Sequence, residues 1–165
     1  MRKAVQLLLV VLMVASGLPG FAQETPSPVT PDQFERVINF ADSIQTLSEL
    51  VQEQRFDEID LSRYFILKGT VASTQVYSPD PETFQAMIEL VSSRWVGLEE
   101  IEVHRIFILV DDPSYAPRLP ERLPRDPGPQ IIRPNQELLV IGPFEGYGEL
   151  EPDVLVPVVR AVRIR

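Results

Sequence analysis

The distribution of hydrophobic and polar positions divides the chain into a helical first part and a β-rich second part. Residues 30–33, Thr-Pro-Asp-Gln, are typical of a helix start, with a hydroxyl cap, proline at the first position and glutamine three residues after the cap. Apolar residues then recur at helical spacing: Phe34, Val37, Ile38, Ala41 and Ile44. A second start at residues 46–49 indicates a helix that ends near Arg55. The pattern leaves open one helix, two helices, or a strand over 34–40 followed by a helix.

From residue 64 onward the pattern changes to that of β-strands. Residues 64–77 are a long strand-like segment with Gly69 in its middle, and a glycine inside a strand usually marks a bulge or a sharp bend. Residues 101–110 alternate at first and are apolar on both faces in their second half, which is typical of a central strand. Segments 137–142 and 154–164 complete this set of strands.

One segment of the β-rich part fits two structures. Residues 81–96 carry apolar positions that suit a helix capped by Asp80 and that suit a strand equally well. Because the flanking segments are β and Ser92-Ser93 precedes Arg94-Trp95-Val96-Gly97, we favour a strand and a turn.

The connection at 111–134 holds seven of the 16 prolines of the chain, which predicts an irregular, polyproline-prone segment. Its Pro117-Arg-Leu-Pro120 stretch matches a PxxP pattern, but a stiff surface loop is the preferred interpretation because such patterns arise easily in proline-rich loops.

The β-rich part resembles an OB-fold. The glycine-bent segment 67–71, Leu-Lys-Gly-Thr-Val, resembles the first OB strand; the segment 134–142 resembles the entry to the fourth strand, and 156–164 the closing strand. The resemblance covers residues 64–165 and departs from the family at the helix between strands three and four, where this chain has the proline-rich loop. It implies an α+β, mostly β fold: a five-stranded, OB-like, partly open barrel preceded by an N-terminal helical region at 30–63. It also implies a small exported binding or stress-related module.

The first residues read as a secretory signal. Arg2 and Lys3 precede an apolar stretch of 11 positions, and Gly20-Phe21-Ala22 places small residues where signal peptidase cleaves. A retained anchor is disfavoured because a spanning helix needs about 20 apolar residues. We therefore predict a signal peptide at 1–22, a disordered leader at 23–29, and a periplasmic or secreted protein.

Charge and composition narrow the chemistry further. The chain has 15 basic and 24 acidic residues, a formal net charge of −9, so a polyanion partner is disfavoured and we predict no nucleic-acid partner. The absence of cysteine excludes thiol catalysis and every cysteine-ligated metal site. Stability must therefore come from burial without disulfides.

Candidate catalytic groups are few. His104 is the only histidine, and Glu102 lies two residues away on the same strand face, an arrangement that suits acid–base work but lacks an obvious nucleophile. A half-buried cross-strand residue is the preferred interpretation of His104. Carboxylates gather in four runs, at 57–60, 99–102, 111–112 and 145–153. Paired carboxylates can hydrolyse glycosides and clustered ones can bind calcium, but no EF-hand spacing is present and solvated acidic turns explain the runs more simply.

These observations lead to a prediction of function. We expect a non-catalytic exported domain that binds a ligand or protein partner in the cell envelope, with no catalytic residue, metal or cofactor. The alternatives are a carboxylate-dependent hydrolase acting on envelope glycans and a structural envelope assembly protein. OB barrels bind on the face of strands two and three, which predicts a ligand site at Tyr77, Arg94, Trp95 and His104. Aromatic rings beside a guanidinium suit stacking on planar groups, although a buried Trp95 that plugs the barrel is the preferred alternative.

Overall fold

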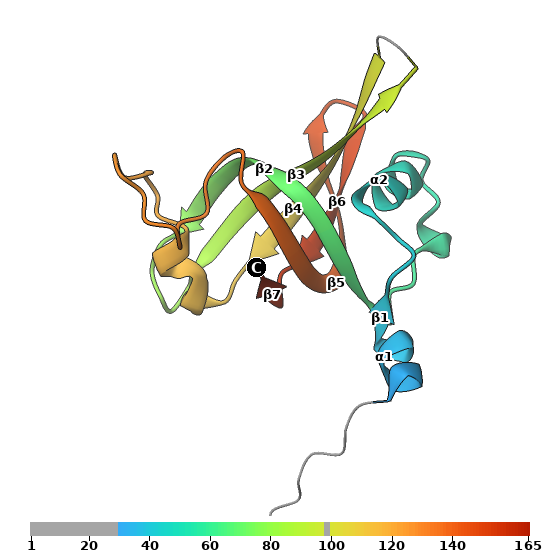
Figure 1. Cartoon of the computed structure of the whole chain (residues 1–165), viewed down its shortest axis with the longest axis horizontal. Helices are drawn as coiled ribbons and strands as arrows, with labels where there is room; N and C mark the ends of the chain where they lie inside the picture. Colours follow the sequence, from blue (N-terminus) through green and yellow to red (C-terminus); the bar gives the residue numbers. More distant parts are fainter. Residues whose placement is uncertain (1–29, 98–99) are drawn as a thin grey trace, which may run out of the picture.

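The structure, a computed structural model, describes residues 30–97 and 100–165 and consists of a strongly curved sheet with helical segments at its two ends (Figure 1). Its elements follow in the order α1 (Pro31–Val37), β1 (Ile38–Asn39), α2 (Ile44–Gln52), η1 (Phe56–Glu58), β2 (Tyr64–Ser78), β3 (Gln85–Val96), β4 (Glu100–Val110), η2 (Pro113–Arg118), β5 (Glu137–Glu151), β6 (Val154–Arg160) and β7 (Arg163–Ile164). The predicted signal peptide and leader, 1–22 and 23–29, lie outside the described residues.

The first helix begins where the sequence predicts. The Thr30 backbone N–H donates to the Gln33 side-chain oxygen at 3.0 Å, as a capping box requires. The segment 34–40, for which the sequence left helix and strand open, is helical to Val37 and then forms the two-residue strand β1, which pairs parallel with the start of β2. The second helix starts earlier than expected, because Ser43 caps it by accepting the Thr46 backbone N–H at 3.3 Å.

Strands β2, β3, β4, β6 and β5 form a closed five-stranded barrel in that order, and β5 pairs back onto β2. The strand order and the parallel pairing of the third and fifth barrel strands, β4 and β6, confirm the predicted OB-like fold. The barrel is only partly zipped, because β4 and β6 pair over no more than Phe107–Leu109.

The long first barrel strand changes partner at Thr70, directly after Gly69. Residues 64–70 of β2 pair with β5, and residues 70–78 pair with β3. A Cβ atom at Gly69 would lie 2.7 Å from Cδ1 of Ile44 and 3.0 Å from the carbonyl oxygen of Val91. Gly69 therefore permits α2 and β3 to approach the strand, while the irregular register of β2 lies further along, after Val71 and after Val76.

The ambiguous segment 81–96 is a strand from Gln85, which confirms the favoured interpretation. Its burial alternates with a period of two, and Ala86, Ile88 and Leu90 are fully buried in the barrel. The apolar residues of this segment also fit a helix. The segment forms a strand because it pairs with β2 on one side and with β4 on the other.

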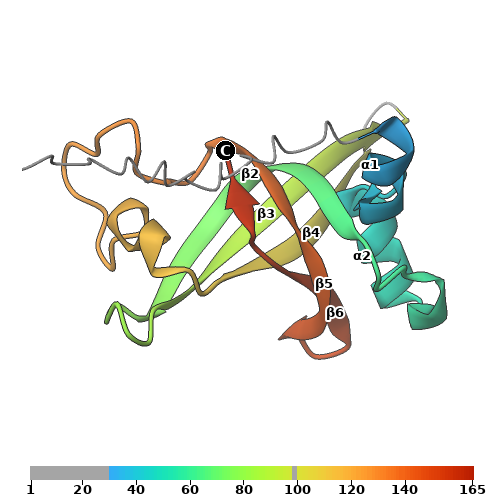
Figure 2. The same cartoon turned by 90° about the horizontal axis from the view of Figure 1, so that it is seen from below.

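The two ends of the barrel are covered by different segments (Figures 1 and 2). Helix α2 covers one end, with Ile44, Leu47 and Val51 buried. The segment 111–136, with η2, covers the other end and stands where an OB-fold has its helix. The sequence favoured a stiff surface loop there, but Tyr115, Leu119 and Ile132 belong to the core cluster, so the segment is also a lid on the barrel.

We predict that Gly142→Ala destabilises the protein by about 2 kcal/mol or more, within the range for overpacking in a rigid site. A Cβ atom there would lie 1.8 Å from the carbonyl oxygen of Arg160, and backbone cannot move aside as a side chain can. Gly148→Ala on the same strand is the matched control, since its Cβ would only touch the Phe107 ring at 3.4 Å. Urea unfolding gives the free energy of unfolding of both variants. Equal values for the two variants would contradict the prediction.

Candidate functional site

The β3–β4 hairpin projects beyond the barrel (Figure 1). Its pairing continues to the Val96–Glu100 pair, whereas the pairing of β4 with β6 ends at Phe107. Because side chains alternate along a strand, Arg94, Glu102 and His104 share the face that continues the barrel interior. Trp95, Ile101 and Val103 share the outer face, and each of them is about half exposed or more.

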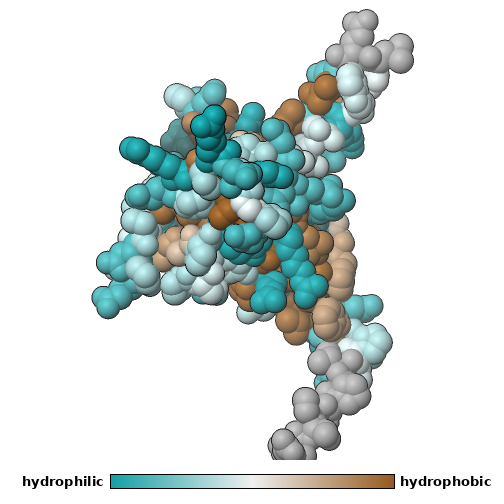
Figure 3. Space-filling model, turned by 60° about the vertical axis from the view of Figure 1, so that its left-hand side comes forward, coloured by the Kyte–Doolittle hydropathy of each residue, from teal (hydrophilic) through white to brown (hydrophobic). Residues whose placement is uncertain are grey.

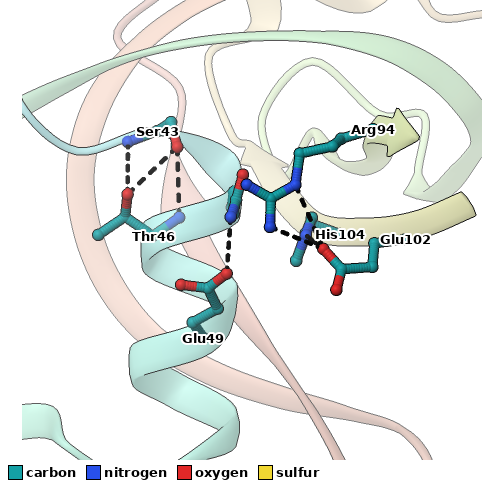
Figure 4. A network of polar contacts seen from close by, with 7 residues as sticks. Ser43, Thr46, Glu49, Arg94, Glu102 and His104 are labelled. Atoms are coloured by element: carbon teal, nitrogen blue, oxygen red, sulfur yellow. Dashed lines mark hydrogen bonds and ion pairs between the residues drawn. The ribbon is translucent and has the colours of Figure 1, made fainter. Parts of the chain in front are cut away.

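The interior-side face of the hairpin carries a polar network (Figure 4). Arg94 donates to the Glu102 carboxylate, with Nη2 at 2.9 Å and Nε at 3.3 Å. The Nε2 atom of His104 lies 3.7 Å from the same carboxylate, too far for a hydrogen bond. His104 Nε2 is buried and has no hydrogen-bond partner among the described residues. The guanidinium of Arg94 is directed toward α2 (Figure 4).

Helix α2 lies across the place where β4 and β6 part. Ser48 Oγ donates to the Arg105 carbonyl oxygen of β4 at 2.7 Å. Gln52 bridges the other strand edge: its Nε2 donates to the Asp153 carbonyl oxygen at 3.0 Å, and its Oε1 accepts the Leu155 backbone N–H at 3.1 Å. A cavity of about 310 Å³ remains between the helix and the two strands.

The four predicted ligand residues lie at two opposite ends of the sheet. Arg94, Trp95 and His104 are on the projecting hairpin, and Glu102 links the first to the third. Tyr77 lies beside the Val76–Ala86 pair, about 30 Å along β3 from Trp95. Trp95 is 67% exposed, so the interpretation of this residue as a barrel plug is wrong. Ligand binding by these residues stays a prediction.

A second candidate surface is a set of arginines at the lid end of the barrel, which we call the arginine end. It consists of Arg118, Arg122, Arg125, Arg133, Arg163 and Arg165. None of these six arginines forms an ion pair with a carboxylate of the described residues. The arginines and the lysine that do form such pairs lie elsewhere: Arg55, Arg63, Lys68, Arg94, Arg105 and Arg160. The arginine end therefore gathers guanidinium groups that no ion pair within the described residues neutralises.

Hydrogen bonds hold the two segments of the arginine end together. Arg118 donates from Nη1 to the Ile164 carbonyl oxygen and from Nε to the Gln130 carbonyl oxygen, each at 3.3 Å. The Tyr115 hydroxyl accepts the Ile164 backbone N–H at 3.0 Å, and Arg118 lies over the Tyr115 ring. At the start of the segment, the Ser114 backbone N–H and then its hydroxyl lower the pKa of Asp112, the cap of η2.

The charge of this end differs from that of the rest of the chain. Residues 113–134 and 161–165 hold six arginines and two acidic residues, a net charge of +4. Since the whole chain carries −9, the remainder carries −13. Figure 3, in which this side comes forward, shows long hydrophilic side chains projecting from it. This surface was not predicted from the sequence, although the proline-rich loop carries four arginines and only two acidic residues over 113–134, which is the signal that could have indicated it.

Other site types find no support within the described residues. No group of three histidine or acidic side chains is placed there to hold a metal ion. Nor is any helix there long and apolar enough to cross a membrane.

Comparison with known proteins gives neighbours of fold only. No family model matches the chain, and no curated protein matches it. Solved structures that resemble it include a small single-stranded DNA binding protein from Mycoplasma pneumoniae (14% identity, 62% of this chain and 90% of that one, TM-score 0.40). They also include a small single-stranded DNA-binding protein from Streptomyces coelicolor (9%, 62% and 89%, TM-score 0.41) and a mitochondrial one from S. cerevisiae (12%, 65% and 94%, TM-score 0.41).

These neighbours are described as DNA-binding proteins, one of them mitochondrial, and they correct four predictions. The exported envelope function, with its hydrolase and assembly alternatives, is wrong. So are the description of the chain as a secreted protein, the periplasmic or secreted location, and the exclusion of a nucleic-acid partner. That exclusion failed for a physical reason: it used the net charge of the chain, which hides the segregated arginines.

We predict that Gln52→Ala weakens the junction of α2 with β6, because the Leu155 N–H and the Asp153 carbonyl lose their partner. The expected cost is about 1–2 kcal/mol, with faster hydrogen exchange at Leu155. Gln45→Ala is the matched control on the same helix, since Gln45 bonds only the Glu49 side chain, at 2.8 Å. Unchanged exchange at Leu155 in the Gln52 variant would contradict the role assigned to this bridge.

Proposed function

We propose that this chain is a non-catalytic OB-fold domain that binds a single-stranded nucleic acid through the arginine end. The observation that carries the proposal is the segregation of charge: a region of net charge +4 with six unneutralised guanidinium groups, on a chain whose remainder carries −13. An acidic protein that keeps such a cluster out of ion pairs with its own carboxylates has a surface suited to an anionic partner.

The chemistry of the cluster suits phosphates. Arginine presents a planar fork of donors that bonds phosphate oxygens in pairs. Arg122, Arg125 and Arg133 are exposed, as are Arg163 and Arg165. Most cations elsewhere in the described residues engage carboxylates, as in the pairs of Arg105 with Glu89 and of Lys68 with Glu137, and are therefore less able to release counterions from a nucleic acid.

The neighbouring surface suits an unpaired base. Tyr77 is 53% exposed and lies at the same end of the sheet as the start of the lid, because Val76 is opposite Ala86 and Ala86 is opposite Val110. Aromatic rings beside a basic groove stack the bases of single strands. Phe84, in the turn between β2 and β3, and Tyr115 of the lid are both buried in the core cluster, and loops of this kind flank the ligand face of OB barrels.

The strong negative charge elsewhere limits the interface to this end. A strand that extended toward α2 and the hairpin would meet Glu49, Glu53 and Glu100, so the contact is expected to span few nucleotides and to be strongly weakened by salt.

We predict that Arg122→Gln combined with Arg125→Gln makes the salt dependence of binding shallower. Losing two phosphate contacts reduces the slope of log K against log salt by about 1.4, at about 0.7 per contact for a single strand. The measurement is fluorescence anisotropy with a labelled oligonucleotide of about 16 nucleotides, the upper size for one OB-fold site. Tyr77→Ala should weaken binding by about 1–3 kcal/mol and leave the slope unchanged.

The matched control is Arg36→Gln with Arg63→Gln, which removes the same charge from the N-terminal region. This variant should keep the parent affinity and slope. An equal loss in both double variants would show a nonspecific charge effect, and absence of binding at low salt would refute the proposed function.

A further inference from the structure

One strand edge of the barrel is left open on the projecting hairpin. The backbone carbonyl groups of Arg105 and Leu109 point away from β3. The Arg105 oxygen accepts a hydrogen bond from the Ser48 hydroxyl, and the Leu109 oxygen accepts one from the Ala161 N–H at 2.8 Å. Backbone direction alternates along a strand, so the N–H and C=O groups of Ile101 and Val103 point to the same side. In the described part of the chain β4 has no strand partner on that side before Phe107.

Both faces beside this edge have a defined chemistry. The outer face carries exposed apolar side chains, with Ile101 and Val103 each 49% exposed and Trp95 opposite Ile101 on β3. The interior-side face carries Glu100, the Glu102–Arg94 ion pair and the orphan Nε2 of His104. Exposed strand edges with apolar side chains tend to pair with another strand.

The edge is complementary to itself. Antiparallel pairing with a second copy, with Ile101 opposite Val103 of that copy, joins two residues that both point their backbone groups outward. In this register Glu100 lies opposite His104 of the second copy, so an acidic side chain stands across the pair from the imidazole on the interior-side face. The two Glu102 side chains meet at the two-fold axis, each neutralised by its own Arg94 at 2.9 Å. On the outer face the apolar side chains of both copies form one strip.

From this complementarity we infer that the chain forms a two-fold symmetric dimer by pairing the Glu100–His104 edges of two copies. The pairing ends at Arg105, where Ser48 of α2 occupies the edge. A foreign peptide could satisfy the backbone groups, but the second copy also supplies the matching apolar residues Ile101, Val103 and Trp95 on the outer face. The interface is isologous and therefore closes at two copies.

The first test is the oligomeric state of Val103→Lys, measured by sedimentation from micromolar to millimolar concentration. A lysine on this edge removes an apolar contact and places positive charge at both symmetric positions, so the dissociation constant should rise at least about tenfold. Val37→Lys is the matched control, because Val37 has the same 49% exposure on α1. If the unmodified chain is a monomer at all concentrations, or if the Val103→Lys and Val37→Lys dimers have equal dissociation constants, the inference is overturned.

The second test reads the register by cross-linking. The chain has no cysteine, so a single introduced one reports alone. Glu102→Cys places two thiols at a non-hydrogen-bonded pair about 4.5 Å apart between Cα atoms, within disulfide range. Glu100→Cys places them about 13 Å apart, since residue 100 lies opposite residue 104. Efficient disulfide formation at 102 and little at 100 is expected; the reverse order or equal yields would refute this register.

Discussion

The fold depends on how the backbone groups are satisfied where β4 and β6 separate. An OB barrel removes strand edges by closing on itself, yet here the closing pair is joined only at Phe107–Leu109. Each hydrogen bond to such a backbone group contributes about 0.5–1.5 kcal/mol to stability. Ser48 and Gln52 of α2 supply partners on both strands, and Ile44 of the same helix packs against Gly69. Helix α2 is therefore an integral part of the barrel, because without it the split between the strands has no cover.

Local patterns predicted those elements whose structure is decided locally. The capping box at Thr30, the strand from Tyr64 and the strand 101–110 depend on neighbouring residues, and they formed where expected. The segment from Gln85 fitted two periods, and only its pairing with strands on both sides decides between them. The role of α2 could not be predicted, because it depends on backbone groups that lie 57 and 101 residues away.

The candidate surfaces show the same division between local and long-range information. Residue type identified Tyr77, Arg94, Trp95 and His104, but their grouping depends on strand register, which places Tyr77 apart from the other three. Net charge likewise gave a misleading picture, because a sum does not show which cations are neutralised. Arg94 and Arg105 have carboxylate partners on the adjacent strand, whereas the arginines of the lid have none within the described residues. Only the pairing of side chains separates these two populations.

The two proposed surfaces are compatible because the barrel keeps them apart. β3 runs from the lid end at Gln85 to the hairpin at Val96, a span of about 36 Å. This distance is several times the Debye length of about 8 Å at physiological salt, so charge at the arginine end has little effect on the hairpin. Two copies joined at their hairpins would hold their arginine ends at opposite extremes of the dimer. A single strand long enough to reach both ends would then bind more tightly than either end alone, because the second contact becomes intramolecular.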